Sequence, residues 1–370
     1  MGSGRNHHLL ERILQKLLQS LLILAAFSSV SSTRAFSFNG NPKVAVIGST
    51  GNVGVETIVH LHKEGIPTKC LLRHDLPDSN AGIEPSIDKG ATKEQKLAYL
   101  SELSTVEWIR GDISDPSSLR TLLKDCTAIL AVHGAPKPSS PFQDIASTLF
   151  PSSDPKALDS LPLDHSYHVN YKGVQNLIDA ANDTPTVTRI VRLTGVCDTP
   201  FSFFSILINL LGRLAKAYNY QGEMLLRSES QKPNVSWDYT IIRPGYMSAD
   251  DINEGEGILA LADNGEKLPV SKMSYAQVAS LCSQVCDYPN CGGSTLTAAN
   301  VEPGMGTKEY GTLLEKVEAD TKSFPSDLLR EHVKGARLGA AMGVVIFGGL
   351  IKSLVSALAL IFGLVSKAFH

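Results

Sequence analysis

Three glycines spaced three residues apart follow a short apolar run early in the chain. In the stretch VAVIGSTGNVG, which covers residues 44–54, they are Gly48, Gly51 and Gly54. Such spacing allows a tight turn, a close approach of the backbone to a phosphate group, and close packing of a helix on a strand. The amide groups at the start of that helix attract an anion. The stretch therefore predicts a binding site for the pyrophosphate of a dinucleotide.

The residues after the second apolar run, TKCLLR at 68–73, indicate which dinucleotide binds. An acidic side chain at this point binds the ribose hydroxyls of NAD, whereas a guanidinium suits the 2′-phosphate of NADP. Arg73 and His74 stand here, so NADP is favoured. Asp75 lies two residues after Arg73 and keeps NAD as an alternative. The other interpretation of Arg73 is a solvated surface charge.

Two further strand ends carry residues suited to the same cofactor. Asp112 and Ile113 follow the run VEWIR, and an aspartate at this place is able to accept a hydrogen bond from the adenine amino group. The alternative is that Asp115 caps the next helix and Asp112 only shapes the turn. His133 and Gly134 follow the fourth run, AILAV, where a glycine offers its backbone beside the cofactor.

These residues are positioned by an alternation of short apolar runs and longer amphipathic ones over residues 43–330. The alternation predicts a parallel sheet with helices on both faces, which is a Rossmann-type, doubly wound α/β fold. Because crossovers are right-handed, the carboxyl ends of the strands meet at one edge, where ligands bind. A small C-terminal lobe on the substrate side and an apolar helical tail complete the expected architecture. The expected strands are 43–48, 68–73, 106–112, 128–134, 189–195 and 238–245, and the expected helices include 51–65, 91–103, 117–126, 168–183 and 222–230.

Seven segments give a more specific resemblance. In order along the chain they are VIGSTGNVG, LLRHD, GDISDPSSL, VNYKGVQNLIDAA, RLTG, GEMLLRSES and YTIIRPG. Together they resemble the atypical short-chain dehydrogenase/reductases, of the NmrA-like kind found in plastids and cyanobacteria, from residue 43 to about residue 300. The run EKLPVSKMSYAQVASLCSQV is similar to that family's late helix, which packs back on the domain.

The resemblance implies an NAD(P)-binding domain with cofactor contacts at the matching positions. The implied contacts are Gly48, Ser49, Thr50, Gly51, Asn52, Val53, Gly54, Arg73, His74, Asp112, Ile113, His133 and Gly134, with Thr194, Pro244 and Gly245 lining the nicotinamide end. NADP is the expected cofactor, and NAD is the less favoured alternative.

The residues for catalysis are harder to identify. The conventional enzymes of this superfamily use Tyr-x-x-x-Lys, in which the lysine lowers the pKa of the tyrosine so that the phenol donates a proton as hydride moves. None of the ten tyrosines here has a lysine four residues later. On the helix after the fifth strand, Asn219 stands where plastid relatives often carry lysine, and Lys216 lies one turn earlier. Tyr218 and Tyr220 are candidate proton donors on different faces of this helix, and the alternative is two ordinary packed aromatics.

Two functions are compatible with these features. The first is an NADP-dependent reductase, tethered to a plastid membrane, that acts on an apolar small molecule such as a pigment, a quinone or an isoprenoid precursor. It draws on the apolar segment 198–214, DTPFSFFSILINLLGRL, near the mouth of the expected cleft. The second is a non-catalytic, NADP-loaded scaffold or redox sensor that helps to assemble or regulate a membrane complex. The absence of a Tyr-x-x-x-Lys pair supports this second hypothesis.

The first 35 residues are expected to be a targeting sequence rather than part of the fold. A basic front, the apolar core LLQSLLILAAFSSV and the small residues SSTRA are typical of a secretory signal peptide. Phe36 follows directly, which resembles the two-part plastid presequence of diatoms and related algae, with residues 36–42 as a short transit segment or linker. A cysteine-poor domain for a soluble cofactor suits a plastid stroma. Plain secretion is the alternative.

The last part of the chain, residues 331–370, is expected to associate with a membrane. From 338 to 365 there is one charge, Lys352, and this length is enough to span a bilayer with tilt. Because Lys352 sits near the middle, the stretch is either one helix with the lysine facing a partner or two short segments that dip from one surface. The alternative is a C-terminal helical hairpin packed on the domain.

Small and basic residues accompany this apolar stretch. Gly335, Gly339 and Gly343 repeat every four residues and form a small-residue strip, which lets helices approach closely in membranes. Lys334 and Arg337 flank the stretch, and no acidic residue occurs after Glu331, so the pattern suits an anionic membrane surface.

Composition argues against other classes of partner. With a formal net charge of −3 and no basic stripe interleaved with aromatics, the chain is not expected to bind nucleic acid. Cys282, Cys286 and Cys291 cluster, but without C-x-x-C spacing or a nearby histidine pair, so we expect small buried thiols and no metal site. The expected partners are a nicotinamide dinucleotide and, through residues 338–365, a membrane or a membrane-protein complex.

Overall fold

The computed structural model describes residues 42–76, 83–88, 90–136, 145–249 and 257–345. The predicted targeting sequence and residues 346–370 of the predicted tail lie outside the described residues. Plastid targeting and membrane insertion of the tail therefore stay predictions.

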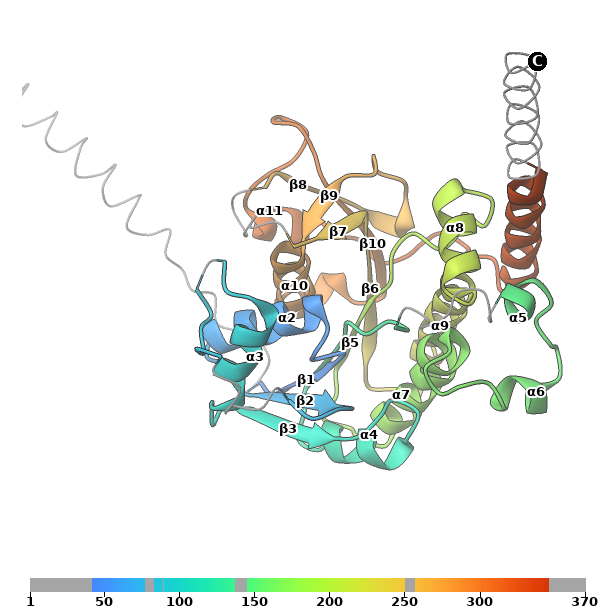
Figure 1. Ribbon diagram of the computed structural model, residues 1–370. Coiled ribbons are helices and arrows are strands. Elements are labelled where there is room, and N and C mark those ends of the chain that lie inside the picture. The colour runs from blue at the N-terminus through green and yellow to red at the C-terminus, as the bar shows by residue number, and fades with distance from the viewer. Residues whose placement is uncertain (1–41, 77–82, 89, 137–144, 250–256, 346–370) are drawn as a thin grey trace, which may run out of the picture. The chain divides into compact units, whose positions relative to one another are not determined.

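A mixed, mostly parallel sheet of eight strands forms the centre of the domain (Figure 1). Its strands are β1 (Val44–Ile47), β2 (Thr68–Leu72), β3 (Val106–Arg110), β4 (Ala128–Ala131), β5 (Arg189–Leu193), β6 (Asp238–Pro244), β8 (Leu259–Ala262) and β10 (Ser294–Asn300). The order is β3-β2-β1-β4-β5-β6-β10-β8, and every neighbouring pair is parallel except β10 and β8. The strand order reverses between β1 and β4, as in doubly wound folds. All six predicted strands are present, and the predicted Rossmann-type fold is confirmed.

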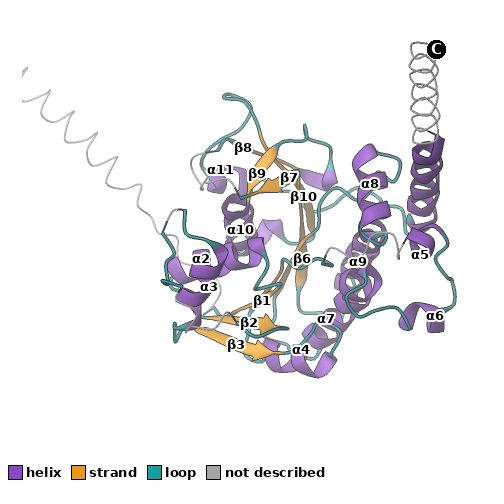
Figure 2. Cartoon of the chain, viewed as in Figure 1, coloured by secondary structure: helices purple, strands orange, loops and turns teal. Residues whose placement is uncertain are grey.

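Helices cover both faces of this sheet (Figure 2). They are α2 (Asn52–Lys63), α3 (Lys93–Ser101), α4 (Pro116–Leu123), α5 (Ile145–Leu149), α6 (Pro155–Asp159), α7 (Gly173–Asn182), α8 (Phe203–Leu211), α9 (Ala215–Ser230), α10 (Tyr275–Gln284) and α11 (Tyr310–Leu314), with a π-helical turn η1 (Tyr167–Lys172) before α7. α2 packs on α10 on one face, and α7 packs on α4 and α9 on the other. The main hydrophobic core lies under α4, α7 and α9 and includes Leu119, Leu177, Ile190 and Trp237. The central strands are buried on both sides, which explains their continuous apolar runs.

A smaller lobe follows β6, as the sequence predicts. It contains β7 (Tyr246–Ser248), the 3₁₀ turn η2 (Asp263–Gly265) and β9 (Lys272–Ser274), and β7 pairs with β9 in a separate two-stranded sheet. Within this region β8 and β10 return to the main sheet. The sequence pattern did not reveal β10, because STLTAAN lacks the large apolar residues that mark the other central strands.

The predicted tail begins as a helix, residues 329–345, that packs on the domain. His332, Val333 and Ala336 are buried, and the last two belong to a second hydrophobic cluster with Tyr218 on α9. Within the described ranges, no helix is long and apolar enough to cross a bilayer. The start of the tail therefore contributes to the packing of the domain.

The small-residue strip accounts for the close approach of this helix to α8. A Cβ at Gly335 would lie 2.6 Å from the carbonyl oxygen of Pro200, and one at Gly339 would lie 2.2 Å from Cγ2 of Ile206. A Cβ at Gly343 would meet nothing within 4 Å. Two of the three glycines thus pack against a neighbouring helix of the same chain, where a larger residue does not fit.

Candidate functional site

A cavity of about 310 Å³ lies at the carboxyl ends of β1, β2, β3 and β4, where parallel sheets of this topology bind ligands. The predicted cofactor contacts that line it are Gly48, Ser49, Thr50, Gly51, Arg73, Asp112, Ile113, His133 and Gly134. The predicted contacts outside it are Asn52, Val53, Gly54, His74, Thr194, Pro244 and Gly245. A larger hollow of about 530 Å³ lies beside α2 and α3, but no residue that lines it belongs to a strand end of the main sheet.

The glycine turn at the floor of this cavity leaves no room for side chains. Gly48 has φ +90°, and a Cβ there would lie 2.7 Å from Cα of His133. A Cβ at Gly54 would lie 2.0 Å from the carbonyl oxygen of Gly48. Gly51 is the N-cap residue of α2 and provides no side-chain cap, so the first turn presents its amides to the cavity end of the helix. Uncapped amides and close backbone approach are the features that a pyrophosphate needs.

Two arginines stand at adjacent strand ends beside the cavity. Arg73 directly follows Leu72, whose register partner on β3 is Arg110. The Arg110 side chain forms an ion pair with Asp75, and both side chains are exposed. Asp75, the acidic residue on which the NAD alternative is based, is therefore paired with Arg110, while Arg73 lines the cavity. This arrangement favours an anionic group, such as a 2′-phosphate, at the end of β2.

The two aspartates of the turn after β3 have separate roles in the structure. Asp115 accepts hydrogen bonds from the amides of Ser117 and Ser118 and so caps α4, as the alternative predicted. One carboxylate oxygen of Asp112 accepts hydrogen bonds from the amide and the hydroxyl of Ser114, at 2.8 and 2.7 Å. Asp112 therefore shapes the turn and, from that position, also lines the cavity.

A buried arginine that the sequence analysis did not single out supports the cavity wall. Arg192 on β5 donates hydrogen bonds to the carbonyl oxygens of Ala131 and His133, at 3.0 and 2.7 Å, and to Oδ1 of Asn219 at 3.1 Å. Asn219 is thus a partner of Arg192. Burial, together with Arg192, holds the pKa of His133 well below its usual value, so this ring is neutral at the cavity wall.

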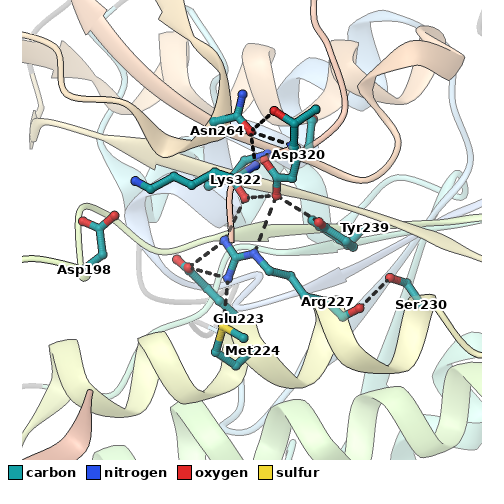
Figure 3. Close-up of polar contacts among 12 residues, drawn as sticks. Asp198, Glu223, Met224, Arg227, Ser230, Tyr239, Asn264, Asp320 and Lys322 are labelled. Carbon is teal, nitrogen blue, oxygen red and sulfur yellow. Dashed lines mark hydrogen bonds and ion pairs between the residues drawn. The ribbon is translucent and has the colours of Figure 1, made fainter. Parts of the chain in front are cut away.

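A buried network of charges lies under the carboxyl ends of β5 and β6. Figure 3 shows the part of it that joins Glu223 through Arg227 to Asp320. Glu223 on α9 has a fully buried side chain and accepts hydrogen bonds from Thr194 at 2.7 Å, Arg227 at 3.2 Å and Arg243 at 2.5 and 3.0 Å. Arg243 also donates to Asp198 at 3.0 Å. Burial alone would raise the pKa of Glu223, but the two arginines lower it to about 2. The i,i+4 ion pair of Glu223 and Arg227 is therefore part of a buried network that joins α9 to β6.

The same network holds a segment from the C-terminal region against the sheet. Asp320 accepts hydrogen bonds from the hydroxyls of Thr295 and Tyr239, at 2.6 and 2.9 Å, and lies 3.6 Å from Nε of Arg227 (Figure 3). The ring of Phe324 lies 3.9 Å from the guanidinium carbon of Arg227. Residues 315–328 thus run across β10 and α9 before the last helix begins.

The three candidates for catalysis have different surroundings. The ammonium of Lys216 lies 3.0 Å from the place that a Cβ of Gly195 would occupy, directly after β5, and burial lowers its pKa. The hydroxyl of Tyr220 donates to the carbonyl oxygen of Pro325 at 2.6 Å. Tyr218 is buried in the cluster beneath the last helix, and burial raises its pKa to about 12. Of these three, Lys216 faces the strand ends.

The remaining predicted residues are placed as follows. Pro244 ends β6, and a Cβ at Gly245 would lie 2.6 Å from the carbonyl oxygen of Ser271, so the smaller lobe approaches the sheet closely there. His74 is exposed. The clustered cysteines are buried free thiols, and the described residues contain no group of side chains able to hold a metal ion.

The comparison with known sequences identifies the family. A family model described as NAD(P)H-binding matches residues 48–289, which include the glycine turn, Arg73, Asp112 and Glu223. The chain belongs to this NAD(P)H-binding family. No curated protein matches the chain at a significant level.

Several solved structures are similar to the domain. A wide-type short-chain dehydrogenase/reductase from Veillonella parvula, in complex with NADP, has 10% identity and a TM-score of 0.47, covering 72% of this chain and 98% of its own. An oxidoreductase from Lactococcus lactis has 17% identity and a TM-score of 0.47, covering 74% and 95%. An anaerobillin reductase from Escherichia coli O157:H7 has 16% identity and a TM-score of 0.46, covering 71% and 100%. Family membership rests on the sequence match and agrees with the strand order described above.

The cavity fits the dinucleotide of this family. When bound, a nicotinamide dinucleotide supplies or accepts a hydride. Gly48 and the start of α2 would hold its pyrophosphate, because a Cβ would fill the space at Gly48 and Gly54. Arg73 would hold the ribose end and Asp112 the adenine. The other end would extend toward β5, where Thr194 and Lys216 lie.

Proposed function

We propose that this NAD(P)H-binding protein is an NADP(H)-dependent reductase, attached to a plastid membrane, that acts on an apolar small molecule such as a pigment, a quinone or an isoprenoid precursor. The observation that carries the proposal is the cavity that joins the glycine turn and the uncapped start of α2 to Arg73. The ion pair between Asp75 and Arg110 supports NADP over NAD, because it neutralises the acid that would bind the ribose hydroxyls.

Lys216 is the proposed proton donor. Hydride transfer to a carbonyl or a conjugated double bond leaves a negative charge that a proton must neutralise. The ammonium of Lys216 lies beside Gly195, two residues after the end of β5, and burial lowers its pKa, which makes it a stronger acid than a solvent-exposed lysine. Arg243, which lies near the lysine, donates hydrogen bonds to both Asp198 and Glu223. Tyr218 and Tyr220 would then have structural roles.

A non-catalytic role is the second candidate, and the positions of the tyrosines favour it. Tyr220 is engaged by Pro325, and Tyr218 is enclosed beneath the last helix. A chain that keeps the nucleotide cavity without a conventional proton donor suits an NADP-loaded scaffold or redox sensor for a membrane complex. In this case the nucleotide would stabilise the fold or report the NADPH level.

The deciding experiment uses the full chain with NADPH and a panel of plastid quinones and pigment precursors. Binding is followed by the nicotinamide fluorescence and oxidation by the nicotinamide absorbance. A reductase binds NADPH and oxidises it with at least one compound, and Lys216→Met lowers the turnover while binding persists. If the protein is a scaffold, the wild type and Lys216→Met bind NADPH equally well, and neither oxidises it with any of the compounds. If neither form binds NADPH or NADH, both proposals are wrong.

Location in the cell is proposed from the sequence. Ala35 and Phe36 support delivery to the plastid of an alga with a two-part presequence, and the apolar residues 338–365 support attachment to a membrane there. The alternative is the secretory pathway, which the test of Phe36 described in the Discussion separates from plastid import.

A further inference from the structure

The amphipathic pattern of α8 is inverted. A surface helix normally turns its polar residues to water and its apolar residues to the core. In α8 the buried residues are Ser205 and Asn209, and Asn209 accepts hydrogen bonds from the first amides of α9. The exposed face carries large apolar residues, which are between 38% and 72% exposed: Phe203, Phe204, Leu207, Ile208 and Leu211. No charged residue occurs between Asp198 and Arg213.

A second apolar stripe borders the same helix contact. On the last helix, Leu338 and Met342 are exposed, and they lie three residues after Gly335 and Gly339. Residues three apart are neighbours on a helix surface, so this stripe adjoins the strip that packs on α8.

The exposed apolar face of α8 and the stripe formed by Leu338 and Met342 lie on the same side of the contact between the two helices. On α8, Phe203 and Leu207 lie three residues before Ile206 and Leu210, which contact Gly339. Gly335 lies against Pro200 and Ile206, and Gly339, about one turn later, lies against Ile206 and Leu210. A later residue on the last helix therefore meets a later residue on α8, so the two helices run in the same general direction. Figure 1 shows them side by side.

Sequence and charge indicate what covers this surface. The helix at 329–345 leads into residues 346–365, whose only charge is Lys352. Lys334 and Arg337 on the last helix are exposed, although Lys334 pairs with Glu331 and Arg337 donates a hydrogen bond to the carbonyl oxygen of Leu149. Since no acidic residue occurs after Glu331, this end of the chain carries a net positive charge, which suits an anionic lipid surface. A protein partner would be expected to meet polar residues at the rim of its interface, whereas the exposed face of α8 has none that is charged.

We infer that the exposed face of α8, together with Leu338 and Met342, is an interfacial surface that lies in the headgroup and upper acyl region of an anionic bilayer. The inference rests on the proposed membrane attachment and adds a second, independent contact to it. Because Pro200 and α8 directly follow the loop after β5, this contact would hold the strand ends near Lys216 and Thr194 close to the lipid. An apolar substrate would then reach the site from the membrane rather than through water.

The test places an environment-sensitive fluorescent dye on the full chain. The cysteines of the chain are free and buried, so a cysteine introduced at the surface is labelled selectively. Leu207→Cys places the dye on α8. The matched control, Ser228→Cys, places it on an exposed position of α9, about 20 Å along that helix from its first residue, Ala215. Vesicles of phosphatidylcholine with phosphatidylglycerol are added, and flotation measures how much protein is bound.

We expect flotation of both proteins, with a blue-shifted and several-fold brighter signal from Leu207→Cys and an unchanged signal from Ser228→Cys. The double variant Phe204→Ser, Leu207→Ser should lower vesicle affinity about tenfold or more, since each large apolar side chain that enters lipid contributes strongly. Flotation with an unchanged dye at position 207 overturns the inference for α8 and leaves tail attachment standing. If the protein does not float with the vesicles, the inference for α8 and the attachment through the tail are both overturned. A blue-shifted dye before vesicles are added indicates that a second copy or the chain's own tail covers α8, and also overturns it.

Discussion

Replacing Glu223 by glutamine tests whether the buried charge network holds α9 to the sheet. The variant keeps the size of the side chain and removes the charge that Arg227 and Arg243 share. Both arginines are almost fully buried, but each keeps one carboxylate, Asp320 for Arg227 and Asp198 for Arg243. Removing one partner of a buried ion pair lowers the free energy of unfolding by about 3–5 kcal/mol. Because each arginine keeps a second carboxylate, we expect the loss for Glu223→Gln at the lower end of this range.

The pKa of Glu223 leads to the same magnitude. A fall in pKa from 4.5 to about 2 on folding corresponds to about 3 kcal/mol. Because the folded-state pKa is the lower one, this stability is fully present above about pH 4.5 and is lost as the pH falls toward 2. The variant should therefore lose about 3 kcal/mol at pH 7 and show a weaker dependence of stability on pH in the acid range.

Urea unfolding of the full chain, followed by tryptophan fluorescence, measures both effects, since Trp237 is buried in the main core. The matched control is Glu229→Gln on the same helix, where the carboxylate pairs with Lys232 near the surface and contributes about 0.5 kcal/mol or less. If Glu223→Gln loses less than about 1 kcal/mol, or loses no more than the control, the network does not stabilise the fold as argued.

Three further predictions concern the cofactor, the tail and targeting. Arg73→Ala should weaken NADPH binding by roughly 10–100-fold in a fluorescence titration and leave NADH binding nearly unchanged, because one charged contact to the 2′-phosphate is lost; an equal loss for both nucleotides would contradict this role. Gly339→Ala should destabilise the protein by about 1–3 kcal/mol through its clash with Ile206, whereas Gly343→Ala should be neutral or stabilising; equal effects in thermal unfolding would refute the contact with α8. Phe36→Ala in the tagged full chain should move the protein from the plastid to the secretory route in an alga with such plastids, and unchanged plastid import would exclude the two-part presequence.

Local features of the sequence were sufficient to predict the parts of the site that depend on adjacent residues. The strand ends and the glycine turn were predicted, and the helix cap at Asp115 was the stated alternative, because apolar runs, glycine conformations and side-chain caps act within a few residues. Since parallel strands end at one edge, the meeting of Gly48, Arg73 and Asp112 around one cavity was also predictable.

A second group of residues carried a signal that the sequence analysis left unused. Arg192 and Arg243 are charges at buried positions of the strands RIVRL and DYTIIRP. A charge buried in a sheet needs a partner, so these positions pointed to a buried network. The sequence did not say which carboxylate the partner is, because Glu223 lies 20 residues from Arg243 on a separate helix.

The sequence by itself thus determined the first six strands of the main sheet, most of the helices between them and the strand ends that line the cavity, since these follow from local chemistry and chain direction. Only the tertiary structure decided which way the side chains of α9 point, with Lys216 toward the strand ends, Tyr220 toward Pro325 and Tyr218 into a cluster. It also decided that Gly339 packs on α8 of the same chain. The reason is physical: the face that a helix buries is set by neighbours distant in sequence, and the same small or aromatic residue serves a membrane contact, an active site or a core equally well until those neighbours are in place.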